Sequence, residues 1–202
     1  MSRFDHIAKE WDHSQTRISL AQNIAEGIIN THQLPQEGTL LDFGAGTGLL
    51  TRHLCPHVKA ITALDLSEKM LDQLQHNAAS WPSCQISIAH CDILAYQNDQ
   101  AFDGIVSSMS MHHVQDLQHL FDQFAQLLKP RGFLAIADLE KEDGTFHSDG
   151  NEGVYHFGFE HKALQDIAQK SGFTQISFKH VHTVIKEDGT SYPIFLMSAQ
   201  RL

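Results

Sequence analysis

The fold-deciding stretch of this sequence is residues 40–50, LLDFGAGTGLL. Its apolar start, which contains one acid, Asp42, is typical of a buried strand and runs directly into Gly44, Gly46 and Gly48. Glycine is needed where the backbone takes positive φ or passes within contact distance of a ligand. Leucines at helical spacing follow, so the turn leads into a helix whose exposed N–H groups face the turn. The pattern predicts a binding corner of the nucleotide type.

The spacing of the glycines separates the candidate ligands. A dinucleotide fingerprint reads G-x-G-x-x-G, whereas here the order is G-x-G-x-G, with Gly48 one residue early. A phosphate-binding P-loop needs Gly-Lys-Ser/Thr, and no Lys follows Gly48. Asp42 would repel a pyrophosphate but not a cationic amino acid. An unliganded tight turn is the alternative interpretation.

Composition excludes several classes of protein. The chain has 202 residues, 42% of them hydrophobic, which predicts one globular domain over residues 1–202. A formal charge of −10, with 24 acidic against 14 basic residues, disfavours nucleic acid as the main partner. No apolar run is long enough for a membrane span, and the N-terminus has no signal-peptide core. Cys55, Cys84 and Cys91 have no paired spacing, so we expect free thiols and a cytoplasmic location.

Apolar patterning along the chain predicts alternating strands and helices. The expected strands cover residues 40–43, 58–65, 85–92, 102–107, 133–139, 176–186 and 191–199, and the expected helices include 18–31 and 114–128. The last two strands are joined at 187–190, which contains an Asp-Gly hairpin turn. The acidic, glycine-rich stretch 140–159 is predicted to be a loop, and a loop of this length in a compact domain is usually functional.

These motifs resemble those of a known family. LLDFGAGTG resembles motif I of the class I S-adenosylmethionine-dependent methyltransferases, and LLKPRGFLAI at 127–136 resembles the family's segment after motif IV. The resemblance implies an α/β, Rossmann-like sheet of seven strands in the order 3-2-1-4-5-7-6, with strand 7 antiparallel and helices on both faces. It also implies an N-terminal lid and helix over 1–35, an active-site loop over 139–159, and a small-molecule, ubiquinone/menaquinone-biosynthesis-like branch.

The resemblance also suggests how the cofactor, S-adenosylmethionine, is bound. Asp65 closes the second strand, where a carboxylate can accept both hydroxyls of a ribose. By resemblance, Asp92 bonds the adenine amino group, Ile93 packs on the ring and Trp11 belongs to the lid. The alternatives are a helix N-cap for Asp92, core packing for Met70, and docking of the first helix for Trp11. The expected cofactor-binding residues are Trp11, Asp42, Gly44, Ala45, Gly46, Asp65, Leu66, Met70, Asp92, Ile93 and Ser108.

Candidate general bases lie after the fourth and fifth strands. A base helps methyl transfer only where the acceptor must lose a proton. The candidates are His112, His113, Asp138, Glu140 and His147. We favour His113 as the catalytic residue, because it precedes a strongly amphipathic helix that would position it. A histidine satisfied by backbone at that helix start is the alternative.

No metal site is expected. His112 and His113 are adjacent and are therefore predicted to point apart, which argues against one ion between them. Two further sets were considered as weak metal candidates: the strand pair His180 and His182, and the loop group Glu140, Glu142, His147 and His156.

The sequence therefore predicts a cytoplasmic S-adenosylmethionine-dependent methyltransferase, with a small-molecule substrate and neither nucleic acid nor membrane as partner. Two alternatives remain. One is a non-catalytic partner subunit that keeps the cofactor pocket, and the other is a nucleotide-cofactor oxidoreductase, against which Gly48 argues. The acceptor and the oligomeric state are not specified by the sequence.

Overall fold

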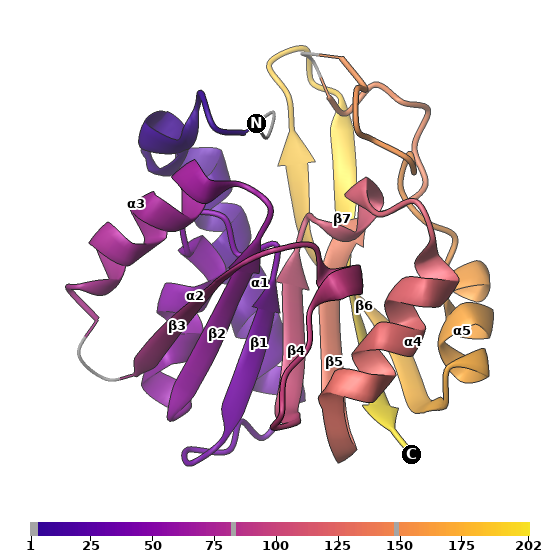
Figure 1. Ribbon diagram of the computed structural model, residues 1–202. Helices are drawn as coiled ribbons and strands as arrows, with labels where there is room; N and C mark the ends of the chain where they lie inside the picture. Colours follow the sequence, from indigo (N-terminus) through magenta and orange to yellow (C-terminus); the bar gives the residue numbers. More distant parts are fainter. Residues whose placement is uncertain (1–3, 82–83, 148–149) are drawn as a thin grey trace.

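The computed structural model describes residues 4–81, 84–147 and 150–202 (Figure 1). Its seven-stranded sheet has the order β3-β2-β1-β4-β5-β7-β6, with β7 antiparallel to both neighbours. This confirms the predicted fold. The strands are β1 Thr39–Phe43, β2 Ala60–Asp65, β3 Gln85–His90, β4 Phe102–Ser108, β5 Leu128–Leu139, β6 Phe173–Ile185 and β7 Ser191–Arg201.

Helices cover both faces of this sheet, as predicted (Figure 1). The α-helices are α1 Gln15–Thr31, α2 Leu49–Leu54, α3 Glu68–Ala78, α4 Leu117–Leu127 and α5 His161–Lys170. Within the described residues, four short 3-10 helices accompany them: η1 Ala8–His13, η2 Cys55–His57, η3 Ile93–Ala95 and η4 Met111–His113. Residues 1–3 of the predicted lid and 148–149 of the predicted loop lie outside the described residues.

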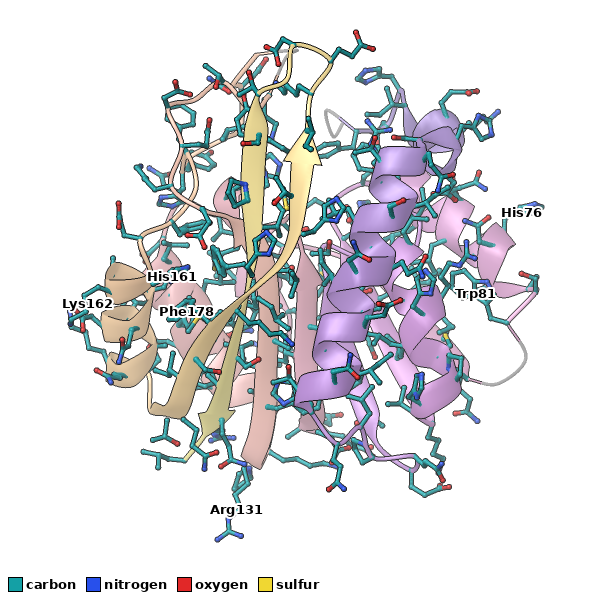
Figure 2. All side chains as sticks on the ribbon, turned by 180° about the vertical axis from the view of Figure 1, so that it is seen from behind. His76, Trp81, Arg131, His161, Lys162 and Phe178 are labelled. Carbon is teal, nitrogen blue, oxygen red and sulfur yellow. The ribbon has the colours of Figure 1, made fainter. Side chains whose placement is uncertain are left out.

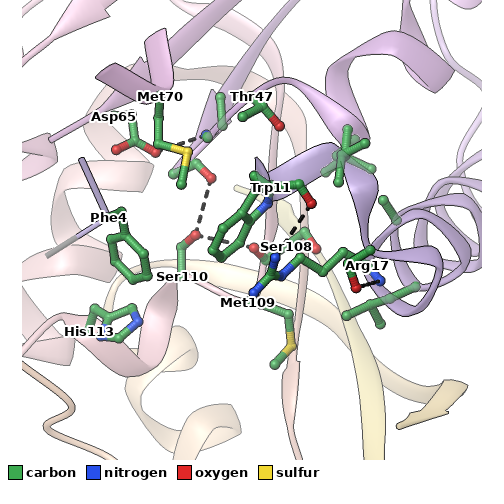
Figure 3. Close-up of a pocket in the computed structure, with 18 of the residues that line it drawn as sticks. Phe4, Trp11, Arg17, Thr47, Asp65, Met70, Ser108, Met109, Ser110 and His113 are labelled. Carbon is green, nitrogen blue, oxygen red and sulfur yellow. Dashed lines mark hydrogen bonds between the residues drawn. The ribbon is translucent and has the colours of Figure 1, made fainter. Parts of the chain in front are cut away.

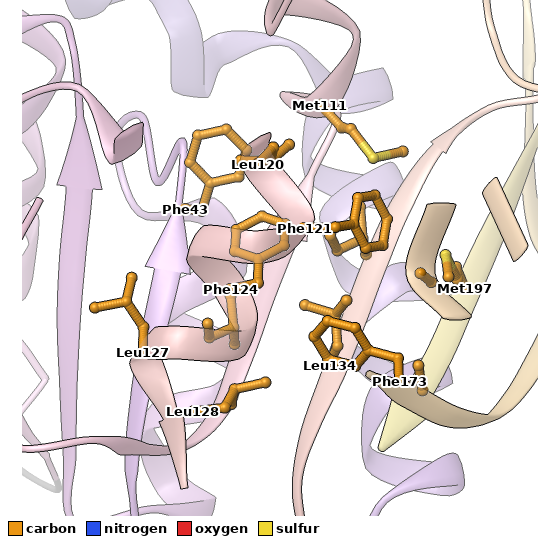
Figure 4. Close-up of a cluster of buried hydrophobic side chains, with 14 of the residues drawn as sticks. Phe43, Met111, Leu120, Phe121, Phe124, Leu127, Leu128, Leu134, Phe173 and Met197 are labelled. Atoms are coloured by element: carbon orange, nitrogen blue, oxygen red, sulfur yellow. The ribbon is translucent and has the colours of Figure 1, made fainter. Parts of the chain in front are cut away.

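Successive residues of the central strands enter different cores, because side chains alternate across a strand. Leu40 packs among residues of α1 and α2, and its neighbour Leu41 packs among residues of α4 and α5. The core that contains Leu41, between the sheet and helices α4 and α5, is rich in phenylalanine. Figure 4 shows Phe121, Phe124 and Phe173 gathered there. Because helices cover both faces, the central strands β1 and β4 are buried along most of their length, whereas the edge strands β3 and β6 are largely half-buried or exposed.

An aromatic contact packs α5 against β6, the edge strand beside β7. His161 of α5 lies on Phe178 of β6 with the two rings stacked at a centroid distance of 4.1 Å (Figure 2). Phe195 of β7 meets both rings edge-on. This contact fixes α5 against the terminal hairpin.

The predicted boundaries differ from the observed ones mainly around α4. The helix begins at Leu117, not at residue 114, because the Asp116 side chain caps it by accepting the His119 N–H at 3.0 Å. Residues 111–113 form the separate turn η4. β5 begins at Leu128, five residues earlier than predicted: Leu128 pairs with Phe102 of β4, and the register then shifts before pairing resumes between Gly104 and Phe133.

The order of the strands places the site. β1 pairs with β2 on one side and with β4 on the other, so the sheet reverses direction of progression beside β1. In open α/β sheets, ligands bind outside the carboxyl ends of the strands at such a point. No helix in the described part of the chain is long and apolar enough to span a bilayer.

The terminal hairpin offers a matched pair of isoleucines with which to test the packing. Ile194 of β7 is fully buried (0% exposed), whereas Ile185 of β6 is 67% exposed. We expect Ile194→Ala to lower the free energy of unfolding by about 2–5 kcal/mol, since it leaves a cavity. Ile185→Ala should cost less than about 1 kcal/mol. Urea denaturation measures the two losses in free energy of unfolding, provided that its dependence on urea concentration is the same for both variants. Equal losses would contradict the described register.

Candidate active site

The turn after β1 uses its first two glycines for different reasons. At Gly44, a Cβ would lie 2.0 Å from the Ser110 hydroxyl oxygen, so this glycine permits the close approach of the segment after β4. At Gly46, where φ is +54°, a Cβ would meet no atom within 4 Å. Gly46 also lines a cavity. The space beside its Cα is therefore open to a ligand and not filled by packing.

Asp65, at the end of β2, holds this turn in place. Its carboxylate accepts the Gly46 N–H through Oδ2 and the Ser67 N–H through Oδ1, both at 2.8 Å. Burial raises the pKa of Asp65, and these backbone hydrogen bonds oppose the rise. A carboxylate has about four lone-pair sites. Asp65 therefore keeps capacity to accept hydroxyl groups from a ligand in the cavity.

Asp42 supplies a second acid beneath the turn. It is 1% exposed, and the Thr51 hydroxyl donates to its Oδ2. Burial raises the pKa of Asp42 to about 7, the Thr51 hydrogen bond opposes the rise, and the nearby charge of Asp65 adds to it. A cationic ligand group placed near Asp42 would favour its ionised form.

The N-terminal segment closes over the turn (Figure 3). The Asp12 carboxylate accepts from the Thr47 hydroxyl and, at 2.8 Å, from the Asn77 amide. Trp11 lines the cavity, and the Arg17 guanidinium lies 3.8 Å from the centroid of its ring. These contacts place η1 across the end of α3 and above the glycine turn.

The resulting cavity has a volume of about 490 Å³, within the range of small-molecule sites. It brings together most of the predicted site residues: Trp11, Asp42, Gly44, Ala45, Gly46, Asp65, Met70, Ser108 and His113. Three others do not line it. Leu66 is 62% exposed beyond the turn, Asp92 caps η3 by accepting the Leu94 N–H, and Ile93 is buried in the core.

Several residues in the wall were not predicted. They are Phe4, Arg17, Thr47, Met109, Ser110, Phe146 and Lys186. Ser110 lies in the polar stretch that follows β4, near the predicted residue Ser108. Phe146 and Lys186 carried no signal, because they reach the cavity only through the fold of the 140–159 loop and the terminal hairpin.

Histidines line the opposite wall. The His112 Nδ1–H donates to Asp138 Oδ1 at 2.7 Å, and both side chains are buried. The His113 Nδ1–H donates to the Gly153 carbonyl at 2.7 Å. The prediction that His112 and His113 point apart is wrong, because their ring centroids are only 4.2 Å apart. Both are in the tight turn η4, where Asp138 and the loop hold the rings on the same side.

The environment of His113 keeps it neutral. Burial, together with the neighbouring His112 and His147, lowers the pKa of His113 to about 4, against the opposing effects of the Gly153 carbonyl and Asp138. Its ring also lies edge-on to Phe4 at 5.5 Å, which joins the N-terminal segment to the histidine wall (Figure 3).

In the structure, members of the two weak metal-candidate sets are hydrogen-bonded to other groups. His182 Nδ1 is hydrogen-bonded to the Asn23 amide and His180 Nε2 to the Thr183 hydroxyl. In the loop, the Glu142 carboxylate accepts the backbone N–H groups of residues 144–146, and His156 Nε2 donates to the Val114 carbonyl. Of the loop set, His147 alone lines the cavity.

Comparison with known proteins agrees with this geometry. A family model described as a methyltransferase domain matches residues 41–136. The chain is 32% identical over 161 residues to an uncharacterized methyltransferase of Schizosaccharomyces pombe, which covers 72% of this chain and 56% of that protein. It is 27% identical over 175 residues to a ubiquinone biosynthesis O-methyltransferase of Coxiella burnetii, which covers 84% of this chain and 74% of that protein.

A solved structure shares the fold. The S-adenosylmethionine-dependent methyltransferase from Aquifex aeolicus superposes with a TM-score of 0.73 at 18% identity, covering 98% of both chains. Fold and site define an α/β protein with a nucleoside-type cavity at the switch point of its sheet. The chain belongs to the class I S-adenosylmethionine-dependent methyltransferase superfamily, which confirms the predicted family. It spans about half the length of the S. pombe relative.

Asp42 makes the stability of the fold depend on pH. Since its pKa is raised to about 7 in the folded state, folding is favoured at low pH, and stability falls as the pH rises from about 4 to about 7. Asp42→Asn removes this loss. We expect the free energy of unfolding of the variant, relative to wild type, to rise over that window by on the order of 2–4 kcal/mol and then level off.

Urea denaturation at several pH values measures this difference. Asp99→Asn, on the exposed surface, is the control and should give a small difference that does not change across the window. A relative stability of Asp42→Asn that stays flat from pH 4 to 8 would contradict the described burial of the carboxylate.

Proposed function

We propose that this protein is a methyltransferase that uses S-adenosylmethionine to methylate a small-molecule acceptor. The observation that carries the proposal is the open space at Gly46, beside Asp65, in a cavity that continues to the histidine wall. One end of this cavity has the groups that a nucleoside needs, and the other has the groups that an acceptor needs.

The residues at the turn fit the cofactor. Asp65 has acceptor capacity for the two hydroxyls of the ribose, and Gly46 leaves its main chain uncovered beside them. Asp42 lies where the cationic amino acid end of the cofactor can offset its buried charge. Met70 and Trp11 offer apolar surface to the adenosine. Leu66, Asp92 and Ile93 stay predictions for the adenine end.

The bound cofactor supplies a methyl group on a sulfonium, which an acceptor's lone pair can displace in line. The task of the protein is to hold the acceptor at contact distance and to exclude water. The N-terminal segment contributes to both, since Phe4 and Trp11 together line the cavity on its outer side. His113 presents a neutral imidazole to the acceptor side.

The acceptor side favours a small, partly apolar molecule with an anionic or polar group. Met109, Phe146 and Val184 supply apolar surface. Lys186 lies among them, where its Nζ donates to the Thr145 carbonyl at 2.6 Å. The similarity to an O-methyltransferase of ubiquinone biosynthesis supports a hydroxyl acceptor. The formal charge of −10 argues against nucleic acid.

A pair of glycine variants tests the cofactor site. Gly46→Ala places a methyl group in the open space, and we expect it to weaken binding of S-adenosylhomocysteine by at least about 100-fold, or about 2.7 kcal/mol. Gly172→Ala is the matched control, because Gly172 also has positive φ (+85°) and open surroundings, but ends α5 far from the cavity. In both variants, a Cβ at positive φ lowers the free energy of unfolding by a similar amount, about 1–2 kcal/mol.

Isothermal calorimetry with S-adenosylhomocysteine measures the two affinities. Equal affinities for Gly46→Ala and Gly172→Ala, or no binding to the wild-type chain at millimolar ligand, would overturn the cofactor assignment. Transfer of a labelled methyl group from S-adenosylmethionine across hydroxyl, thiol and amine acceptors then tests catalysis. A chain that binds the cofactor but methylates none of these classes would support the non-catalytic alternative.

A further inference from the structure

The histidine wall contains a cluster that methyl transfer does not require. One ring nitrogen each from His112, His113 and His147 lies within 4.8 Å of the others. The ring of His147 is centred 5.1 Å from that of His112 and 5.8 Å from that of His113. All three residues line the cavity. Three imidazoles from two separate segments therefore converge at one point of its wall.

His112 is prepared as a ligand by its neighbours. Asp138, which is fully buried, accepts the Nδ1–H and also the His112 backbone N–H at 3.2 Å. Proton and ring orientation are thereby fixed, and the lone pair is left on Nε2. That atom is buried and has no hydrogen-bond partner among the described residues. Since an unpaired buried nitrogen is costly, the site is incomplete without a partner for it.

His113 is prepared in the same way by a different acceptor. Its Nδ1 lies 2.7 Å from the Gly153 carbonyl, which can only accept, so the proton is on Nδ1 and the lone pair on Nε2. Histidines that bind metals in proteins usually donate the other ring N–H to a carboxylate or a backbone carbonyl, which fixes ring and tautomer. Asp138 and Gly153 supply one of each.

We propose that His112, His113 and His147 bind one divalent first-row transition-metal ion, with Zn²⁺ as the reference ion, whose remaining coordination position faces the cavity. Imidazole nitrogens suit Zn, Cu, Fe and Ni, and a set without carboxylate ligands does not suit Mg²⁺ or Ca²⁺. Three protein ligands with one open position are the arrangement of catalytic zinc sites.

The segment that carries His147 provides the adjustment that binding needs. Zinc–nitrogen distances of about 2.0–2.1 Å require the ligand atoms to move closer together than they now lie. His112 is held by Asp138 of β5, whereas His113 is held by the Gly153 carbonyl of the 140–159 loop, which also carries His147. The loop is docked on η4 through the Tyr155 N–H, which donates to the His112 carbonyl at 3.0 Å. With the loop docked there, a rotation of the His147 side chain toward His112 and His113 would supply the remaining adjustment.

Resting on the proposed function, the metal site specifies the acceptor as a hydroxyl or thiol. A metal ion lowers the pKa of a bound hydroxyl, so the acceptor gives its proton to water and keeps the electron pair. That pair forms the bond to the methyl carbon as the carbon–sulfur bond breaks, and S-adenosylhomocysteine leaves as a neutral thioether. No oxidant or reductant is needed.

Metal binding is tested on the full chain after removal of metal with a chelator. Calorimetric titration with Zn²⁺ should give one equivalent bound at micromolar affinity or better, and Co²⁺ should give the visible absorption of a tetrahedral nitrogen site. His113→Ala and His147→Ala should each weaken Zn²⁺ binding by more than about 100-fold, since loss of even an outer-shell partner costs 10–100-fold.

His180→Ala is the control, because it removes an exposed histidine outside the cluster and should bind Zn²⁺ like the wild type. Since His112 is buried, its substitution could fail to fold, and the test therefore rests on His113 and His147. The proposal is overturned if the stripped wild-type chain binds no stoichiometric Zn²⁺. It is also overturned if all three variants bind alike, which would assign the metal to surface histidines.

The same samples separate the metal proposal from the proposed function. A wild-type chain that binds S-adenosylhomocysteine but no Zn²⁺ or Co²⁺ keeps the cofactor assignment and loses the metal site. A chain that binds one Zn²⁺ through His113 and His147 but no S-adenosylhomocysteine keeps the metal site and loses the methyltransferase assignment.

Discussion

The hydrogen bond between the Gly46 N–H and the Asp65 carboxylate is the constraint on which this molecule depends. It ties the turn after β1 to the end of β2, so two neighbouring strands meet the ligand space as one surface. A side chain at Gly46 would fill the space that this bond keeps open, and loss of Asp65 would release both the turn and the start of α3 at Ser67. Fold and ligand space thus share one contact.

Much of the architecture could be predicted because its signals are local. The strands and the terminal hairpin followed from the apolar runs and the Asp-Gly turn, whereas the strand order was implied by the family resemblance, and the fold was confirmed. The error at the start of α4 arises where two local signals, apolar period and capping, compete. Val114 continues the apolar period of α4, yet the helix begins at Leu117 because Asp116 caps it there. The spacing of apolar residues does not show at which residue an N-cap begins the helix.

The site could be predicted only in part, for the same reason. Residues that act through the backbone turn, such as Gly46 and Asp65, were visible from spacing and do line the cavity. His112, His113 and His147 were candidates for a general base and also line the cavity, but their close grouping was not predicted, because adjacent residues were expected to diverge. The paired orientation of His112 and His113 is imposed by Asp138, which is 26 residues from His112, and by the carbonyl of Gly153. Tertiary acceptors, not sequence spacing, decide where those rings point.

The N-terminal segment connects the two halves of the cavity. Asp12 accepts from Thr47 and Asn77 at the cofactor end, while Phe4 meets His113 at the acceptor end. Each such hydrogen bond to a carboxylate contributes only about 1.5–3 kcal/mol net. A segment held by a few of them can detach while the sheet stays folded, which is required if ligands enter beneath Trp11 and Phe4. One short segment therefore contacts both ends of the cavity, through Asp12 at one end and Phe4 at the other.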